Sequence, residues 1–139
     1  MSSRVVAAVL LSPAVVAAAG CGPATTYAIT LEVRDGWVRE PGTECAGSRP
    51  FLYVHADAPY RVVDARSGDV VASGALPAGT AVEALREDLG VSRVPSFCRF
   101  RLTVPLPGPG QYRLVLSEGD PLRFTAAAAP GEPILLTIP

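Results

Sequence analysis

Three cysteines and one histidine offer this 139-residue chain its widest choice of chemistry: Cys21, Cys45, Cys98 and His55. Thiolates and imidazoles bind zinc or copper, and paired thiols carry out redox exchange. No two of the cysteines have the C-x-x-C spacing, and a single histidine with two cysteines supplies too few ligands for a typical site. We therefore expect no metal ion and no cofactor.

A hydrolytic triad would need His55 beside a serine such as Ser67 or Ser73. His55 lies in "VHAD", which is typical of a strand, and neither serine has the G-x-S-x-G frame. Paired carboxylates could serve glycoside hydrolysis, but most acidic residues are expected in turns, where aspartate stabilises the bend: Asp35, Asp64, Asp69 and Asp120. We expect no catalytic residue, and the chain is not predicted to be an enzyme.

The charge of the chain is nearly balanced, with 12 basic residues against 13 acidic ones and a formal net charge of -1. This balance argues against nucleic acid as a partner. Two arrangements could form a binding surface. Trp37 beside Arg39 could stack on a sugar ring or contact a protein, or Trp37 could simply cover the core. Arg99 and Arg101 share a strand face that suits anionic wall polymers or lipid headgroups, or they could merely solvate that face.

The N-terminal segment has the pattern of a signal peptide. Arg4 and the amino terminus precede an uncharged run from Val5 to Gly20 that ends in small residues. The last residues, Ala18, Ala19, Gly20 and Cys21, resemble the lipobox of bacterial lipoproteins. The resemblance implies cleavage after residues 1–20, a diacylglyceryl group on Cys21, and a lipid-anchored tether over residues 21–26. An ordinary signal peptide, with Cys21 unmodified, is the alternative.

Acylation of Cys21 would leave an even number of cysteines in an oxidising compartment. We therefore expect a disulfide between Cys45 and Cys98.

Residues 27–139 are predicted to form one β domain. In "YAITLEV", Tyr27, Ile29, Leu31 and Val33 share one face, as in a half-buried strand. Asp35-Gly36 is expected to turn the chain into "WVRE". Further short β-prone segments follow, separated by Gly, Pro, Asp or Ser: "FLYVHA", "YRVVDA", "VVASGAL", "CRFRLTV", "QYRLVLS", "LRFTA" and "ILLTI". The prolines of residues 105–110 predict a connection, and a β-meander is expected after it.

One segment carries helix signals. Thr80 and Glu83 form a T-x-x-E capping box, apolar residues recur at helical spacing, and Gly90 could end the helix. These signals predict a short helix over residues 81–89 within a connection between two sheets. The alternative is a binding loop that includes "GVSRVP".

The region from Cys45 to residue 126 resembles small secreted β-sandwich modules of high-GC Gram-positive bacteria. The hairpin "VVDARSGDVV" also resembles the carboxypeptidase-regulatory and transthyretin-like group of immunoglobulin-like folds. The resemblance implies an all-β, immunoglobulin-like antiparallel sandwich of about 7–9 strands with no catalytic residues.

Location and fold together predict a non-catalytic cell-envelope lipoprotein on the outer face of the cytoplasmic membrane. It would act as a binding or structural module, joined to the membrane through its N-terminal lipid, with an envelope protein or a glycan as partner. The alternative function is that of a soluble secreted regulator or inhibitor of an extracytoplasmic enzyme.

Overall fold

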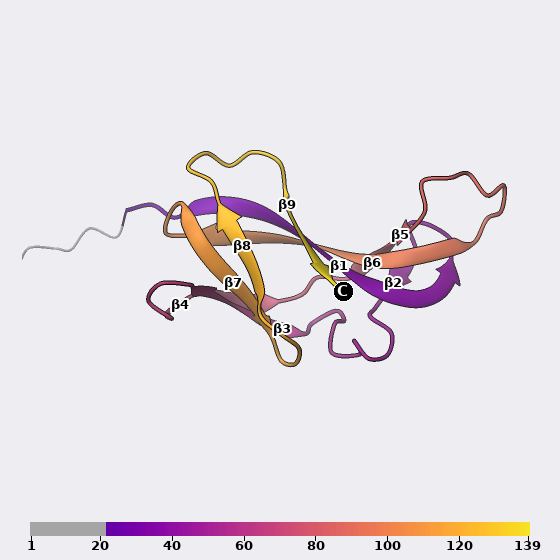
Figure 1. The fold of residues 1–139 in the computed structure, drawn as a ribbon, viewed down its shortest axis with the longest axis horizontal. Helices are drawn as coiled ribbons and strands as arrows, with labels where there is room; N and C mark the ends of the chain where they lie inside the picture. Colours follow the sequence, from indigo (N-terminus) through magenta and orange to yellow (C-terminus); the bar gives the residue numbers. More distant parts are fainter. Residues whose placement is uncertain (1–21) are drawn as a thin grey trace, which may run out of the picture.

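A computed structural model describes residues 22–139, which form nine strands in two sheets and no helix (Figure 1). The five-stranded sheet has the order β2-β5-β6-β1-β9, with β1 at Thr25–Arg39, β2 at Glu44–Cys45, β5 at Gly79–Glu83, β6 at Val94–Leu106 and β9 at Ile134–Ile138. The four-stranded sheet has the order β4-β3-β7-β8, with β3 at Pro59–Asp64, β4 at Val70–Ala75, β7 at Gly110–Leu116 and β8 at Leu122–Ala126. The predicted signal peptide and Cys21 lie outside the described residues.

The two longest strands of the sandwich, β1 and β6, pair with each other in an antiparallel manner. Tyr27, Ile29, Leu31 and Val33 are buried, which confirms the alternation predicted for this strand. β6 supplies the matching inner row, including Phe100 opposite Leu31. Because both strands alternate in phase, each turns one apolar face toward the second sheet.

The four-stranded sheet closes the core from the other side. Its inner face presents Val62, Tyr112, Leu114 and Phe124, with the rings of Tyr112 and Phe124 stacked at a centroid distance of 5.7 Å. The Tyr112 hydroxyl donates a hydrogen bond to the carbonyl oxygen of Gly108, at 2.7 Å. This bond ties the start of β7 to the connection that enters it.

The hairpin predicted from "VVDARSGDVV" is confirmed as β3 and β4. The amides of Arg66 and Ser67 donate to Asp64 Oδ1 at 2.7 and 3.0 Å. The hydrogen bond from Ser67, followed by that from Arg66, lowers the pKa of the Asp64 carboxyl, because both donors stabilise its charged form.

The β-meander expected after residues 105–110 is not formed. The predicted connection over residues 105–110 is also shorter than expected, because Pro105 lies in β6 opposite Thr26 and only residues 107–109 lie between β6 and β7. β6 and β7 belong to different sheets, so this connection crosses between layers. β7 and β8 pair with each other, and β9 then returns to pair in parallel with β1. By pairing with β1, β9 buries Leu136 and Ile138 and gives the free edge of β1 a hydrogen-bonded neighbour. These interactions explain why β9 joins β1 instead of forming a hairpin with β8.

The helix predicted over residues 81–89 is wrong. Residues up to Glu83 belong to β5, which pairs with β6 and places Ala81 opposite Cys98. Burial of Ala81 and the ladder of β6 outweigh the local capping signal, because helix propensity is a weak preference beside sheet pairing. Residues 84–93 form an irregular loop, in which the amide of Gly90 donates to Asp88 Oδ1 at 2.8 Å.

The strand predicted over residues 51–56 is also wrong. The amide of Phe51 donates to the carbonyl oxygen of Ser48 at 2.6 Å, and that of Val54 to Phe51 at 3.0 Å. Local turns thus take the backbone bonds that a strand would need. Val54 is buried, so this loop contributes to the core without joining a sheet.

The long strand β1 runs between the two ends of the sandwich. At the end that we call the tether end, the described chain starts and β1 begins at Thr25 (Figure 1). At the other, the distal end, β1 finishes at Arg39 opposite Val94 of β6. The loop of residues 84–93 projects beyond the sheets at this end (Figure 1). β1 has 15 residues, so about 45 Å separates the two ends.

Within residues 22–139 no helix is long and apolar enough to span a membrane. The same residues contain no group of three or more His, Cys, Asp and Glu side chains that could hold a metal ion.

Candidate functional site

A break in the register of β1 shapes the distal end. Arg34 lies opposite Phe97, but Val38 lies opposite Pro95, so three residues of β1 face Ser96 alone. Such a bulge turns side chains away from their regular positions and often lies near binding sites. The expected turn at Asp35-Gly36 is therefore not formed; β1 continues through these residues to Arg39.

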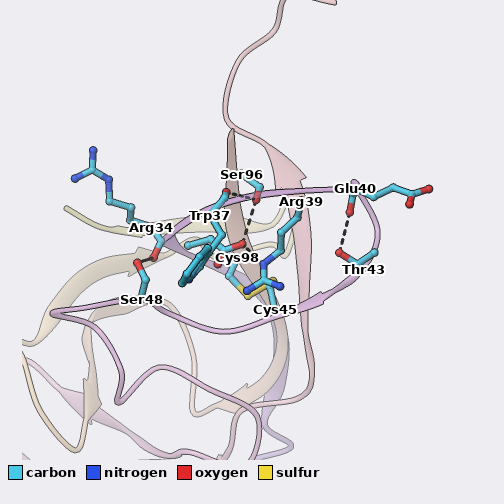
Figure 2. A network of polar contacts seen from close by, with 10 residues as sticks. Arg34, Trp37, Arg39, Glu40, Thr43, Cys45, Ser48, Ser96 and Cys98 are labelled. Carbon is cyan, nitrogen blue, oxygen red and sulfur yellow. Dashed lines mark hydrogen bonds and ion pairs between the residues drawn. A yellow bond between two sulfur atoms is a disulfide. The ribbon is translucent and has the colours of Figure 1, made fainter. Parts of the chain in front are cut away.

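Asp35 continues the inward row of β1 and is fully buried, at 0% exposure. Its Oδ2 accepts a hydrogen bond from Arg39 Nε at 2.5 Å and lies 3.1 Å from the Ser96 hydroxyl oxygen. The same hydroxyl oxygen lies 3.4 Å from the carbonyl oxygen of Trp37, so one serine connects both sides of the bulge (Figure 2). Asp35 Oδ1 makes no hydrogen bond within residues 22–139.

This network fixes the direction of Arg39. Only its Nε is engaged by Asp35, so the terminal amino groups of the guanidinium remain available. In Figure 2 the Trp37 ring and the Arg39 guanidinium point to the same side of β1, and the Arg34 side chain extends away from them. A flat apolar ring and free guanidinium N–H donors are therefore presented together.

A loop that follows β2 forms the opposite wall. The amide and hydroxyl of Ser48 donate to the carbonyl oxygen of Arg34 at 3.2 and 3.3 Å. Gly36, with a φ of 75°, lies so close to Ser48 that a Cβ on Gly36 would collide with the serine hydroxyl. Glycine thus permits both the left-handed backbone and the close approach of the loop.

The predicted disulfide is present and holds the start of this wall. Cys45 on β2 is bonded to Cys98 on β6, with their Cα atoms 5.6 Å apart. Gly79 of β5 leaves the space that the bridge occupies, because a Cβ there would collide with Cys98 Sγ. Cys98 lies two residues from Ser96, so one stretch of β6 fixes both the loop and the bulge.

Between the bulge and the loop lies an open groove of about 670 Å³, which we call the distal groove. It is lined by Arg34, Asp35, Gly36, Trp37, Arg39, Ala46, Gly47, Ser48, Arg49 and Leu52. Three arginines against one carboxylate give the lining a formal charge of +2. The groove thus combines positive charge with two exposed apolar side chains, Trp37 and Leu52.

Trp37 does not cover the core, because 68% of its surface is exposed. Other exposed apolar side chains lie at the same end of the molecule. Of the eight large apolar side chains exposed in residues 22–139, six belong to the distal end: Trp37, Val38, Leu52, Leu85, Leu89 and Val91. Trp37 and Leu52 line the distal groove together, and exposed apolar side chains that share one groove are typical of interaction sites.

The structure separates the two arrangements that the sequence offered as binding surfaces. Trp37 and Arg39 both line the distal groove, whereas Arg99 and Arg101 line a smaller hollow of about 190 Å³ on the outer face of the five-stranded sheet. Arg99 is paired across the strands with Glu32, its Nε 2.7 Å from Glu32 Oε1. Its charge is therefore largely neutralised, and Arg101 is left as the free cation of that hollow among the described residues.

His55 lies in the loop of residues 51–58 and not on a strand, as "VHAD" had suggested. It is exposed, with Nδ1 2.7 Å from the carbonyl oxygen of Ala56. Ser67 and Ser73 lie in the β3–β4 turn and on β4.

Sequence reasoning missed Asp35, Ser48, Arg49, Leu52 and Ser96. A signal for Asp35 was present, because the alternation from Tyr27 to Val33 continues onto position 35. No local signal indicates that Ser96, sixty-one residues away, bonds with it. The chain matches no protein-family model, no curated protein and no solved structure, so the geometry of the groove is the basis for its interpretation.

Proposed function

We propose that this chain is a non-catalytic binding module of the bacterial cell envelope, held at the outer face of the cytoplasmic membrane by a lipid on Cys21. The lipobox-like Ala18, Ala19, Gly20 and Cys21 support the anchor. The cysteine pairing supports it as well, because Cys45 and Cys98 are bonded to each other and leave Cys21 as the odd cysteine. A disulfide also suits an extracytoplasmic compartment.

We assign the sandwich to the immunoglobulin-like group. Support comes from its connectivity, in which β1, β6 and β5 pair in one sheet and β4, β3, β7 and β8 in the other, with connections that cross between the layers. The bond from the Tyr112 hydroxyl to Gly108 resembles the tyrosine corner of that group. The disulfide differs from that of antibody domains, since it joins β2 and β6 of one sheet.

The observation that carries the binding function is Trp37, exposed on a bulge that a half-buried ion pair holds in place. Holding a large exposed ring on a fixed support lowers the entropy cost of binding a ligand. In domains of this group, loops clustered at one end of the sandwich form binding sites. Here the groove lies at the end opposite the proposed anchor, where it can reach material away from the membrane.

The lining of the groove favours an acidic glycan as the ligand. The Trp37 ring can stack on the apolar face of a sugar, and Arg39 and Arg49 can pair with its carboxylates. The open shape of the groove suits a chain that passes through it.

We test the glycan with polygalacturonate as an acidic chain and dextran as a neutral one, by calorimetric titration of the protein. Arg49→Gln is expected to weaken polygalacturonate binding about fivefold, since one charge-assisted bond is lost. Arg66→Gln, an exposed arginine of the β3–β4 turn, is the matched control and should change affinity less than twofold. Equal binding of dextran and polygalacturonate, or equal losses in both variants, would contradict the proposal.

The anchor is tested separately by the intact mass of protein made in a lipoprotein-processing bacterium. The expected mass begins at Cys21 with a diacylglyceryl group and rises by two hydrogens on reduction. A mass without lipid would remove the anchor but leave the glycan result standing.

The exposed apolar residues of the loop 84–93 favour a second function, that of a secreted regulator which docks this loop on an enzyme. An unlipidated Cys21, together with no affinity for polygalacturonate, would favour this function over the first.

A further inference from the structure

The outer face of the four-stranded sheet carries two arginines directly opposite each other. Arg113 on β7 is in register with Arg123 on β8. Like charges in this position destabilise a strand pair. The ion pairs formed within residues 22–139 join Arg39 to Asp35 and Arg99 to Glu32, so Arg113 and Arg123 are without an acidic partner in the described part of the chain.

Arg113 is only partly exposed, and its Nε is buried without a hydrogen-bond partner among the described residues. Leaving a buried donor unpaired is costly, and the cost is larger for a charged group. The carboxyl of Asp64, which lies opposite Tyr112 on the neighbouring strand, is already engaged by the amides of its own turn. The arginine pair is therefore incomplete as it stands.

The two arginines border a hollow of about 320 Å³, which lies on the opposite sheet from Arg99 and Arg101. Gln111 and Thr125, two residues along the same strands, are also opposite each other and line the hollow. They add an amide and a hydroxyl next to the guanidinium groups. The result is a patch of hydrogen-bond donors with a net charge of +2 on two paired strands.

A tetrahedral oxyanion matches this arrangement better than a carboxylate. One guanidinium fork can satisfy both oxygens of a planar carboxylate, whereas a phosphate has further oxygens that a second fork can reach. A volume of this size lies at the lower end of small-molecule pockets.

We propose that the hollow binds a phosphate group between Arg113 and Arg123, either as inorganic phosphate or on a small phosphorylated molecule of about monosaccharide size. The bound oxyanion offsets the repulsion between the two arginines and provides an acceptor for Arg113 Nε. This site is independent of the distal groove, since the two share no residue.

The test is a titration of the full chain with inorganic phosphate, with glucose 6-phosphate and with acetate, at constant ionic strength set with chloride. Vesicles that contain anionic phospholipid are tested in parallel. Binding is followed by the NMR signals of the arginine Nε–H groups and by the midpoint of thermal unfolding. Wild type should show saturable shifts and a rise in Tm. Arg123→Gln should weaken phosphate binding about tenfold or more, because charge-assisted bonds are lost.

Two further variants separate the site from general effects. Arg123→Lys keeps the charge but loses the fork, so it should also bind phosphate more weakly than wild type. Arg86→Gln, in the exposed loop at the distal end, should bind as wild type does. Without phosphate, Arg123→Gln should unfold at or above the wild-type temperature, because it removes a like-charge contact; its weaker binding would then not result from misfolding.

The two ligands distinguish the sources of the phosphate. Tighter binding of glucose 6-phosphate than of phosphate means that the hollow holds the rest of the molecule, and equal binding means that the oxyanion alone is recognised; both support the site. No saturable shift, the same Tm rise in every variant, or equal affinity for acetate would overturn it. Binding only to vesicles that contain anionic phospholipid would also overturn it, in favour of a membrane contact.

Discussion

The tether end and the distal end of the sandwich are built on the same two strands, β1 and β6, but they are held together differently. Toward the tether end, the inward row of β1 is apolar and packs against Tyr112, Leu114 and Phe124 of the other sheet. Toward the distal end, that row reaches Asp35 and the register between β1 and β6 breaks. There a polar network and a disulfide hold the strands and the loop in place. The inward row of β1 thus serves stability in one region, and its interruption at the bulge places Trp37 in the other.

The two ends therefore use different kinds of interaction for different purposes. Apolar burial is non-directional and tolerates small shifts, whereas hydrogen bonds fix both distance and direction. A binding groove benefits from the second kind of interaction. The variants below separate the two regions by their effects on stability and on Trp37.

The disulfide is expected to have the largest effect. Replacing both cysteines, Cys45→Ala with Cys98→Ala, should lower the free energy of unfolding by about 4 kcal/mol, because the bridge closes a separation of 53 residues. Urea unfolding measures this loss. The loop wall should also loosen, so polygalacturonate affinity should fall. A loss below about 1 kcal/mol, with unchanged affinity, would show that the loop is held by other contacts.

Leu114→Ala should cost about 3 kcal/mol, since it leaves a cavity in the fully buried core of the four-stranded sheet. The groove should not respond, because Leu114 belongs to the other sheet and does not line it. We expect the wild-type emission wavelength of Trp37 and the wild-type glycan affinity at temperatures where the variant is folded. A shift of that emission would show that the two regions are coupled.

Asp35→Ala should cost about 2 kcal/mol. This is less than for a fully buried ion pair, because 34% of the Arg39 side chain is exposed. Unlike Leu114→Ala, it should change the Trp37 emission and weaken glycan binding, since Arg39 and the bulge lose their support. Asp35→Asn, which retains an acceptor for Ser96, serves as the milder control and should keep most of the stability. Loss of stability without any change at Trp37 would separate Asp35 from the groove.

Trp37→Ala should have the smallest effect on stability, within about 0.5 kcal/mol, because its ring is mostly in water. Its effect on polygalacturonate binding should be about tenfold, as for a central aromatic contact. Leu135→Ala, another exposed apolar residue, is the control and should alter neither quantity. A destabilisation of 2 kcal/mol or more by Trp37→Ala would mean that the ring serves the fold.

The sequence allowed the all-β class, the inward row from Tyr27 to Val33 and the Cys45–Cys98 bridge to be predicted, because alternation and cysteine count are local or countable properties. The helix predicted over residues 81–89 was wrong. The capping signal is present in the sequence, but Ala81 pairs with β6 as part of β5, and the sequence gives no local sign of that pairing. The return of β9 to β1 and the contact of Ser96 with Asp35 depend on pairings far apart in the chain. Trp37 was noticed from its residue type, but the groove around it depends on a loop that only the fold brings near.

The most direct test uses the fluorescence of Trp37, the one tryptophan of the chain, which reports on the distal groove alone. Polygalacturonate is titrated into the protein while the emission maximum and the quenching by iodide are followed. If the groove binds the glycan, the emission should shift to shorter wavelength in a saturable manner, and the bound ring should be protected from iodide. An unchanged emission with undiminished quenching, in protein that binds polygalacturonate by calorimetry, would place the binding site elsewhere and contradict the role assigned to Trp37.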